Sequence, residues 1–426
     1  MVFVRNAFKN TFLFLLIIFI FCLYGIKTSF SSFFSVSENL TPKTSVAKDS
    51  IKKQLPIIVG ANLTGEYIPI LENKKVAIVG NQTSVIFRDS ITNKNYTHLV
   101  DSLLSRNIKI QKVFAPEHGF RGKADAGELI ADGKDIKTGL PIISLHGKNK
   151  KPSQQSLSDV DIIVFDIQDV GVRFYTYIST LHYVMQACAE NNIPVLILDR
   201  PNPNAHYIDG PTLEPEHSSF VGVHPIPLVH GMTIGEYAKM VNGEGWLGKN
   251  LTCNINIIPV KNYTHSTTYS LPIRPSPNLP NDKAINLYPS LGFFEGTTIN
   301  AGRGTETQFQ IFGSSDLPVE KYDFAYIPKP NFGSKYPKHR GEVCYGKDLR
   351  ESKHLDSINL EWLINAYRNT NAKEKFFNTK SFTIHAGTKK LEEQIKQGLT
   401  FQEIRNTWVK DLQEFKIKRI QYLIYP

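Results

Sequence analysis

Cysteine is scarce in this sequence. Only four cysteines occur in 426 residues: Cys22 near the N-terminus, and Cys188, Cys253 and Cys344 far apart in the rest of the chain. No C-x-x-C pair is present, so the spacing predicts neither a disulfide framework nor a zinc site. We therefore expect the fold to be stabilised by its hydrophobic cores.

Blocks of like charge are also missing. The formal net charge is +10, but lysine and arginine form no run and do not alternate with aromatic residues. This excludes the usual pattern of a nucleic-acid groove, and we expect no nucleic-acid partner. Arg5, Lys9 and Lys27 lie in the N-terminal segment, and without them the remainder carries +7. A mild positive excess of this kind suits an acidic partner such as a carboxylated polymer.

Several well-known functional motifs are absent as well. No G-x-G-x-x-G follows the first strand-like run and no G-x-x-x-x-G-K-[ST] occurs, so nucleotide binding lacks its phosphate cradle and no cofactor is expected. Neither H-E-x-x-H nor G-x-S-x-G is found, which gives a metalloprotease or an α/β-hydrolase no direct support. A metal site remains a weak alternative, because five ligand-type residues could meet at one sheet edge without any ligand-like short spacing: His118, Asp166, Asp169, Asp199 and His230.

The N-terminus has the pattern of a targeting segment. Residues 11–26 are uncharged and apolar and follow Arg5 and Lys9, so residues 1–27 are predicted to be a signal peptide or a membrane anchor. Cys22 invites a lipoprotein interpretation, but the bulky Phe21 precedes it. Residues 28–55 are rich in Ser, Thr and Lys and are expected to form a flexible linker. We expect export to the bacterial periplasm, or anchoring in the inner membrane facing it.

Strand-like and helix-like patterns alternate over residues 56–210. Apolar, β-branched runs predict strands at 74–80, 108–115, 159–167 and 193–199, and helical spacing is found at 97–107 and 177–192. The nearly continuous apolar strands are typical of a parallel sheet buried on both faces. This region is predicted to be an α/β domain with a Rossmann-like, doubly wound parallel sheet.

The region 211–426 is predicted to be a second α+β domain that closes over the first. A capping box, Thr233 with Glu236, begins a predicted helix at 230–246, and Thr400 with Glu403 begins another at 400–412. A strand is expected at 251–260, a proline-rich loop at 273–281, and loop and strand at 288–313. Glu236 is interpreted as a cap rather than as a catalytic group.

A glycine-rich loop after the second predicted strand, "APEHGFRGKADAGE" at 115–128, holds three carboxylic acids, Glu117, Asp125 and Glu128. The carboxyl ends of parallel strands are where ligands bind in open α/β sheets. Glycoside hydrolysis uses one protonated carboxyl group and a second group as base or nucleophile. Apolar neighbours such as Phe114 would raise the pKa of Glu117 for the acid role. The alternative is that Glu117 caps a helix or pairs with Arg121.

The loop after the third strand, "FDIQDVGVRFYTY" at 165–177, provides Asp169, Arg173 and Tyr175. Arg173 could hold a carboxylate through two parallel hydrogen bonds, and Tyr175 could stack on a sugar. An internal Asp169–Arg173 ion pair is the alternative. Further candidates for substrate binding are His118, Arg121, Asn202, His230, Asn278, Glu295 and Arg303.

Taken together, the motifs resemble those of the exo-β-N-acetylmuramidase family. The resemblance runs from about residue 55 to the end and includes "FAPEHGFRGKADAGE", "DIQDVGVRFYTY", "LDRPNP", "SPNLPN", "YPSLGFFEGT" and "NAGRGTE". It implies two domains with a cleft between them, and an enzyme without a cofactor. Such an enzyme removes β-1,4-linked N-acetylmuramic acid from the non-reducing ends of peptidoglycan fragments during cell-wall turnover.

On this interpretation Glu117 is the general acid, and Glu128, Asp125 or Asp169 is the second group. The substrate's own N-acetyl group could take the second role instead. The lactyl carboxylate of the sugar would suit Arg173 and Arg303. Two rival classes stay open: a metal-dependent hydrolase of another envelope component, and a non-catalytic muropeptide-binding protein.

Overall fold

The computed structural model describes residues 55–89, 94–122 and 132–426. The predicted leader at 1–27, nearly all of the linker at 28–55, and the candidate carboxylic acids Asp125 and Glu128 lie outside these ranges. Within the described part of the chain, none of the helices has the length and apolar character needed to span a membrane.

A seven-stranded sheet with the order β5-β6-β4-β1-β7-β8-β9 forms the centre of the fold. Its strands are β1 (Lys75–Gly80), β4 (Lys109–Ala115), β5 (Gly133–Lys134), β6 (Pro141–Ser144), β7 (Ile162–Asp166), β8 (Val195–Leu198) and β9 (Ile255–Ile258). All neighbouring strands are parallel except β5 and β6. From β1 the chain proceeds outward through β4 and β6, then returns to the other side of β1 for β7, β8 and β9. This confirms the Rossmann-like, doubly wound sheet, with its switch point beside β1.

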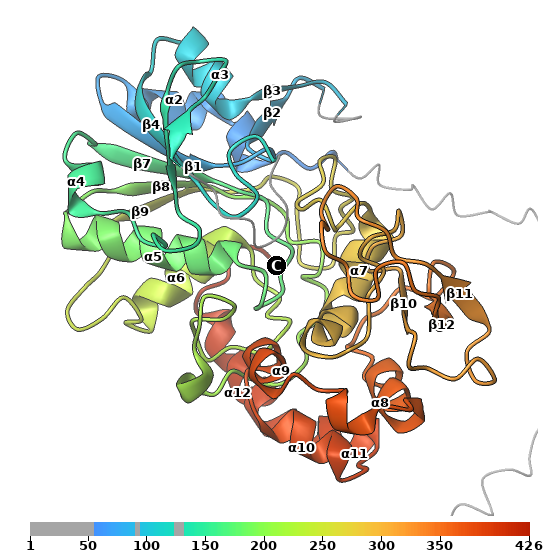
Figure 1. The fold of residues 1–426 in the computed structure, drawn as a ribbon. Coiled ribbons are helices and arrows are strands. Elements are labelled where there is room, and N and C mark those ends of the chain that lie inside the picture. The colour runs from blue at the N-terminus through green and yellow to red at the C-terminus, as the bar shows by residue number, and fades with distance from the viewer. Residues whose placement is uncertain (1–54, 90–93, 123–131) are drawn as a thin grey trace, which may run out of the picture. The chain divides into compact units, whose positions relative to one another are not determined.

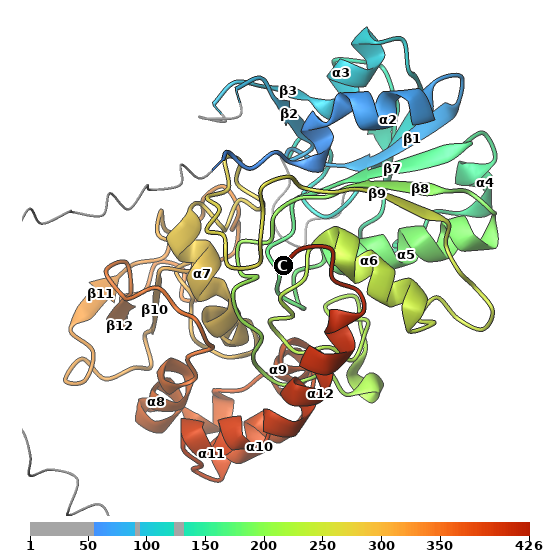
Figure 2. The same cartoon turned by 180° about the vertical axis from the view of Figure 1, so that it is seen from behind.

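Helices cover both faces of this sheet (Figures 1 and 2). On one face, Val76 and Ile78 of β1 belong to a core with α2 (Thr64–Leu71) and α3 (Leu99–Ser105). On the other, Ala77 and Val79 belong to the larger core with α5 (Tyr177–Glu190) and α6 (Ile234–Gly243). The strands are apolar at nearly every position because both of their faces are buried.

The remaining elements follow or flank the sheet. The short strands are β2 (Val85–Phe87) and β3 (Tyr96–His98), which pair with each other, and β10 (Ile311–Ser314), β11 (Phe324–Tyr326) and β12 (Cys344–Asp348), which form an antiparallel sheet of order β10-β12-β11. The other helices are α4 (Gln154–Leu157), α7 (Asp282–Leu291), α8 (Glu361–Asn369), α9 (Thr379–Ala386), α10 (Lys390–Lys396), α11 (Phe401–Asn406) and α12 (Val409–Ile420). The 3-10 helices are η1 (Gly60–Asn62), η2 (Pro215–His217), η3 (Gly292–Gly296) and η4 (Lys373–Lys375).

The second half of the chain differs from the sequence-based expectation in three places. The strand expected at 251–260 forms as β9, but it pairs with β8, so the large sheet extends past residue 210. Residues 54–426 form one compact unit. Part of 288–313 is helical, as the end of α7 and η3, although Pro289 argues against a helix from sequence alone. The helix expected at 400–412 is two helices, α11 and α12.

Both predicted capping boxes are confirmed. In each, the threonine side chain accepts from the backbone N–H of the glutamate three residues later, and that glutamate accepts from the threonine N–H. Thr233 and Glu236 begin α6 in the protein interior, whereas Thr400 and Glu403 begin α11 at the surface.

Candidate active site

A cavity of about 710 Å³ opens beyond the carboxyl ends of β4 and β7. Its lining comes from two parts of the chain that are distant in sequence, 117–221 and 276–385. Six of the predicted site residues meet there: Glu117, His118, Tyr175, Asn278, Glu295 and Arg303. The switch point of the sheet therefore coincides with the cavity, as expected for an open α/β sheet.

Glu117 lies on one wall, two residues after the end of β4. The chain turns sharply there, because His118 and Gly119 both adopt left-handed backbone angles, with φ of 70° and 76°. A non-glycine residue in this region is strained, and such strain is concentrated at functional sites. Oε2 of Glu117 accepts a hydrogen bond from Oγ1 of Thr176 at 2.8 Å. Thr176 is the N-cap residue of α5, so the loops after β4 and β7 are joined at this carboxylate.

Arg121 is not the partner of Glu117. Its Nη2 lies 2.7 Å from Oδ2 of Asp135 and 3.5 Å from Oδ1 of Asp101. Arg121 and Asp101 line a separate, smaller depression beside β2 and β3. The expectation that Arg121 binds substrate in the same cavity as Glu117 is therefore wrong, because two carboxylates already hold its guanidinium elsewhere.

The opposite wall holds an ion pair. Nε of Arg303 donates to Oε1 of Glu295 at 2.9 Å. Burial alone would raise the pKa of Glu295, but Arg303, Lys338 and His385 together lower it below its usual value. Burial would likewise lower the pKa of Arg303, but Glu295, and to a smaller extent Glu117, raise it. This wall therefore presents an ionised carboxylate and a permanently charged guanidinium side by side.

Lys338 and His385 are fixed next to this pair. Nζ of Lys338 donates to four backbone carbonyls, those of Phe294, Glu295, Thr297 and Ile299, at 2.6 to 3.3 Å. Lys338 consequently stabilises the backbone around η3, and its ammonium group is not available to bind a substrate. Nδ1 of His385 lies 2.8 Å from the carbonyl oxygen of Ser381 and must donate to it. Burial lowers the pKa of His385, which leaves a neutral ring whose Nε2 is an acceptor.

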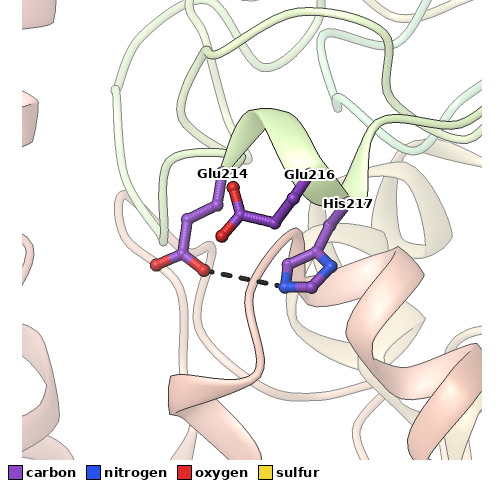
Figure 3. Close-up of side chains that lie close together, drawn as sticks. All are labelled: Glu214, Glu216 and His217. Carbon is purple, nitrogen blue, oxygen red and sulfur yellow. Dashed lines mark ion pairs between the residues drawn. The ribbon is translucent and has the colours of Figure 1, made fainter.

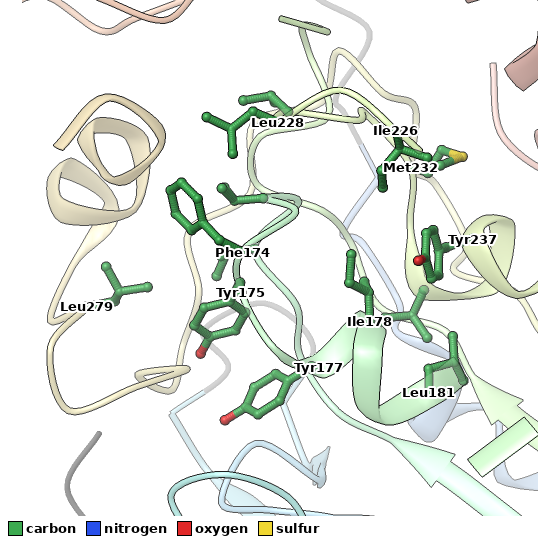
Figure 4. Packing of buried hydrophobic residues seen from close by; sticks show 14 of the residues in the cluster. Phe174, Tyr175, Tyr177, Ile178, Leu181, Ile226, Leu228, Met232, Tyr237 and Leu279 are labelled. Carbon is green, nitrogen blue, oxygen red and sulfur yellow. The ribbon is translucent and has the colours of Figure 1, made fainter. Parts of the chain in front are cut away.

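Aromatic rings make up much of the remaining wall. Tyr175 and Tyr177 donate from their hydroxyls to the carbonyl oxygen of Pro275, at 2.8 and 3.1 Å. Tyr288 contacts Phe174 and Phe309 edge-to-face, with centroid distances of 5.1 and 4.8 Å. Figure 4 shows Phe174, Tyr175 and Tyr177 directed away from the core around Ile178 and Leu181. Such a wall suits the apolar face of a sugar ring.

Arg173 lies outside the cavity. Its side chain is fully buried, and its Nη1 and Nη2 donate to the carbonyls of Pro211, Ile226, His385 and Ala386 at 2.6 to 3.2 Å. The interpretation of Arg173 as a carboxylate clamp is wrong, because these nitrogens bind backbone oxygens. The alternative Asp169–Arg173 ion pair is not formed either among the described residues. Arg173 instead ties the loop after β7 to the end of α9.

Asn202, His230 and Asp169 are buried and also do not line the cavity. Asn202 donates from Nδ2 to the carbonyl of Met232 and packs against the backbone of Gly171. Burial lowers the pKa of His230 to about 3, so it is neutral. Oδ2 of Asp169 accepts from the N–H of Gly171 at 2.7 Å, and burial raises the pKa of Asp169 to about 7. Asn202 and Asp169 thus form contacts that support the loops, and none of the three residues lines the cavity.

The five residues considered as metal ligands do not form a cluster. Asp166 forms a buried ion pair with Arg200 at 2.6 Å, and Asp199 accepts from the hydroxyls of Thr233 and Tyr425. Within the described ranges, the three-residue group whose ligand atoms lie within 4.8 Å of one another is Glu214, Glu216 and His217 (Figure 3). It does not line the cavity, and Oε1 of Glu214 pairs with Lys390 at 2.6 Å.

Several residues that line the cavity were not predicted from the sequence. Tyr288 lies within the motif "YPSLGFFEGT", which could have indicated it. Thr176 lies within the motif "DIQDVGVRFYTY", which could likewise have indicated it. Lys338 and His385 lie in none of the quoted motifs, and only the folded chain brings them to the cavity. Other unpredicted lining residues are His146, Phe174, Phe220 and Tyr336.

Comparisons with known proteins cover nearly all of the described chain. The family model "Exo-beta-N-acetylmuramidase NamZ, N-terminal" matches residues 76–283, and its C-terminal counterpart matches residues 286–425. The peptidoglycan beta-N-acetylmuramidase NamZ of Bacillus subtilis (strain 168) is 37% identical in an alignment 409 residues long, and the alignment covers 91% of this chain and 94% of that protein. Two crystal structures of DUF1343 family proteins from Bacteroides fragilis NCTC 9343 are similar, at 45% and 28% identity with TM-scores of 0.78 and 0.76. Each alignment covers 87% of this chain and 99% of the other.

Proposed function

The chain belongs to the exo-β-N-acetylmuramidase family, and from this premise we propose how its cavity binds and cleaves peptidoglycan. It is a glycosidase that removes N-acetylmuramic acid from the non-reducing ends of peptidoglycan fragments. The observation that supports this assignment best is that Glu117 and the Glu295–Arg303 pair line one cavity with an aromatic wall. A carboxyl group, an anion-binding group and a sugar-stacking surface are what this reaction requires.

Glu117 is the general acid that protonates the glycosidic oxygen. It is held by Thr176 at the carboxyl end of β4 and faces the cavity. Glu295 cannot donate that proton, because its cationic neighbours keep it ionised. Glu295 instead orients Arg303. Asp169 does not line the cavity, and Asp125 and Glu128 lie outside the described residues. We propose that the acetamido group of the substrate supplies the nucleophile.

Arg303 binds the lactyl carboxylate that distinguishes N-acetylmuramic acid from N-acetylglucosamine. Its Nε is occupied by Glu295, and no other described residue engages its two terminal nitrogens. A guanidinium pre-oriented in this way suits a carboxylate. We expect Arg303→Ala to lower kcat/KM for a β-N-acetylmuraminide at least tenfold more than for its β-N-acetylglucosaminide counterpart, as for a lost charged hydrogen bond of about 1.5–3 kcal/mol. Equal losses on both substrates would exclude the lactyl role.

The test of the whole assignment uses the chain from about residue 54 onward with a chromogenic β-N-acetylmuraminide, with and without EDTA. We expect release that EDTA does not affect, and we expect Glu117→Gln to lower kcat at least a hundredfold while the melting temperature stays nearly constant. Loss of activity on chelation, restored by a divalent cation, would favour the metal-dependent hydrolase. Binding without turnover in the wild type would favour the muropeptide-binding protein.

The enzyme is exported, with residues 1–27 as signal peptide or inner-membrane anchor and residues 28–55 as tether. The apolar segment at 11–26 after Arg5 and Lys9 supports this proposal, as does a substrate that lies outside the cytoplasmic membrane. Fractionation of cells producing the full chain should recover it from the periplasm or the inner membrane. Recovery from the cytoplasm would refute export.

A further inference from the structure

The loop 331–338, which contributes Tyr336 to the cavity lining, carries two aromatic side chains that are not buried. Tyr336 lines the cavity and is 86% exposed, and Phe332, four residues earlier, is 57% exposed. The other aromatic residues of the lining are buried or partly buried. The loop 331–338 therefore exposes apolar ring surface at the rim, where it has no role in the core.

This loop is held firmly despite its exposure. The backbones of Asn331 and Ser334 exchange two hydrogen bonds of 3.1 Å, and Nδ2 of Asn278 donates to the carbonyl of Gly333 at 2.8 Å. Pro337 packs against Gly304, which has φ +78°, and a Cβ there would lie only 2.7 Å from the proline ring. The four carbonyl contacts of Lys338 fix the end of the loop.

A fixed ring at a rim lowers the entropy cost of binding, because the loop that presents it is already ordered. Tyrosine also has few rotatable bonds to immobilise. Stacking on a sugar requires an open ring face, which the exposure of Tyr336 provides. The rim is thus suited to a neutral sugar ring rather than to an ion.

The direction in which the bound glycan runs follows from exo-cleavage. An enzyme that removes the terminal sugar keeps that sugar inside the cavity, so the rest of the fragment must leave through the mouth. We propose that Tyr336 forms the subsite for the N-acetylhexosamine on the leaving-group side of the scissile bond. This proposal rests on the proposed function. It adds a binding site for the second sugar of the substrate.

The experiment compares two substrates of the soluble enzyme. Methyl β-N-acetylmuraminide ends at the scissile bond with a methyl group, whereas N-acetylmuramyl-β-1,4-N-acetylglucosamine has a sugar there. We expect Tyr336→Ala to lower the ratio of kcat/KM for the disaccharide over the methyl glycoside roughly tenfold, as for loss of one aromatic contact. Tyr336→Phe should retain the ratio, because the ring face and not the hydroxyl is used.

Tyr96→Ala is the matched control, since Tyr96 is 51% exposed and does not line the cavity. It should leave the ratio unchanged. Equal losses on both substrates in Tyr336→Ala, or none, would overturn the subsite. If the wild type cleaves neither substrate, the proposed function fails instead. Binding of the disaccharide to Glu117→Gln, with and without Tyr336→Ala, then decides the subsite without turnover: weaker binding supports it, and equal binding refutes it.

Discussion

Two arginines that are equivalent candidates in the sequence have opposite roles in the structure. Arg173 is enclosed by backbone carbonyls, whereas Arg303 faces the cavity beside a carboxylate. Each follows closely on a glycine, Gly171 before Arg173 and Gly302 before Arg303, and nothing local distinguishes them. The difference is set by what packs around each guanidinium, which depends on segments remote in sequence.

We expect Arg173→Ala to destabilise the fold by more than about 3 kcal/mol, because it leaves several buried carbonyls without a donor and opens a cavity. Arg173→Lys should rescue little of this loss, since one ammonium cannot reproduce the planar fork. Urea unfolding followed by circular dichroism measures the effect. Arg303→Ala is the comparison and should lose activity with a smaller loss of stability. A soluble, normally stable Arg173→Ala protein that cannot bind muraminides would restore the clamp interpretation.

Among the elements, the two capping boxes share one sequence pattern but differ in their surroundings. Within the described ranges, Glu403 hydrogen-bonds to Thr400 alone, and its side chain is exposed. Glu236 is fully buried; its Oε2 lies 2.9 Å from His265, and its Oε1 accepts from the N–H groups of Ile424 and Tyr425. One carboxylate thus joins the start of α6 to the C-terminal segment of the chain.

We expect Glu403→Ala to have only a small effect on the free energy of unfolding, because this carboxylate is exposed and water can replace it as the acceptor for the Thr400 N–H. Glu236→Ala should cost at least about 3 kcal/mol, because several buried donors lose their acceptor. It should also release the C-terminus, which limited proteolysis with mass spectrometry would detect as early cleavage after α12. Similar unfolding free energies for the two variants would contradict this difference.

For the whole molecule, the parallel sheet was predictable because its central strands β1, β7 and β8 are buried on both faces and are therefore apolar at nearly every position. The place of Glu117 was predictable too, because the carboxyl ends of parallel strands share one edge. The other wall of the cavity was not. Lys338 and His385 lie in segments with no periodic pattern or motif, and β9 joins the large sheet only through pairing with β8. Contacts between remote segments leave no local trace in the sequence.

Histidines that are buried in neutral form make the free energy of unfolding depend on pH in the acid range. Nδ1 of His182 lies 3.0 Å from Nε2 of His224, and the His224 ring stacks on Trp246 at 4.3 Å. Burial lowers the pKa of His182 to about 4, with Lys151 acting in the same direction. Burial and His182 lower the pKa of His224 to about 2.

Below pH 6.5 the unfolded chain binds protons at these histidines, whereas the folded chain does not until about pH 4 for His182. Each histidine therefore lowers the free energy of unfolding as the pH falls through this window, by up to about 1.4 kcal/mol per pH unit. Asp169, whose pKa is raised to about 7, acts in the opposite direction. The difference between the wild type and His182→Gln isolates the histidine: the variant should gain melting temperature relative to the wild type between pH 6.5 and pH 4. Parallel melting curves across that range would show that His182 is protonated equally in the folded and unfolded chains.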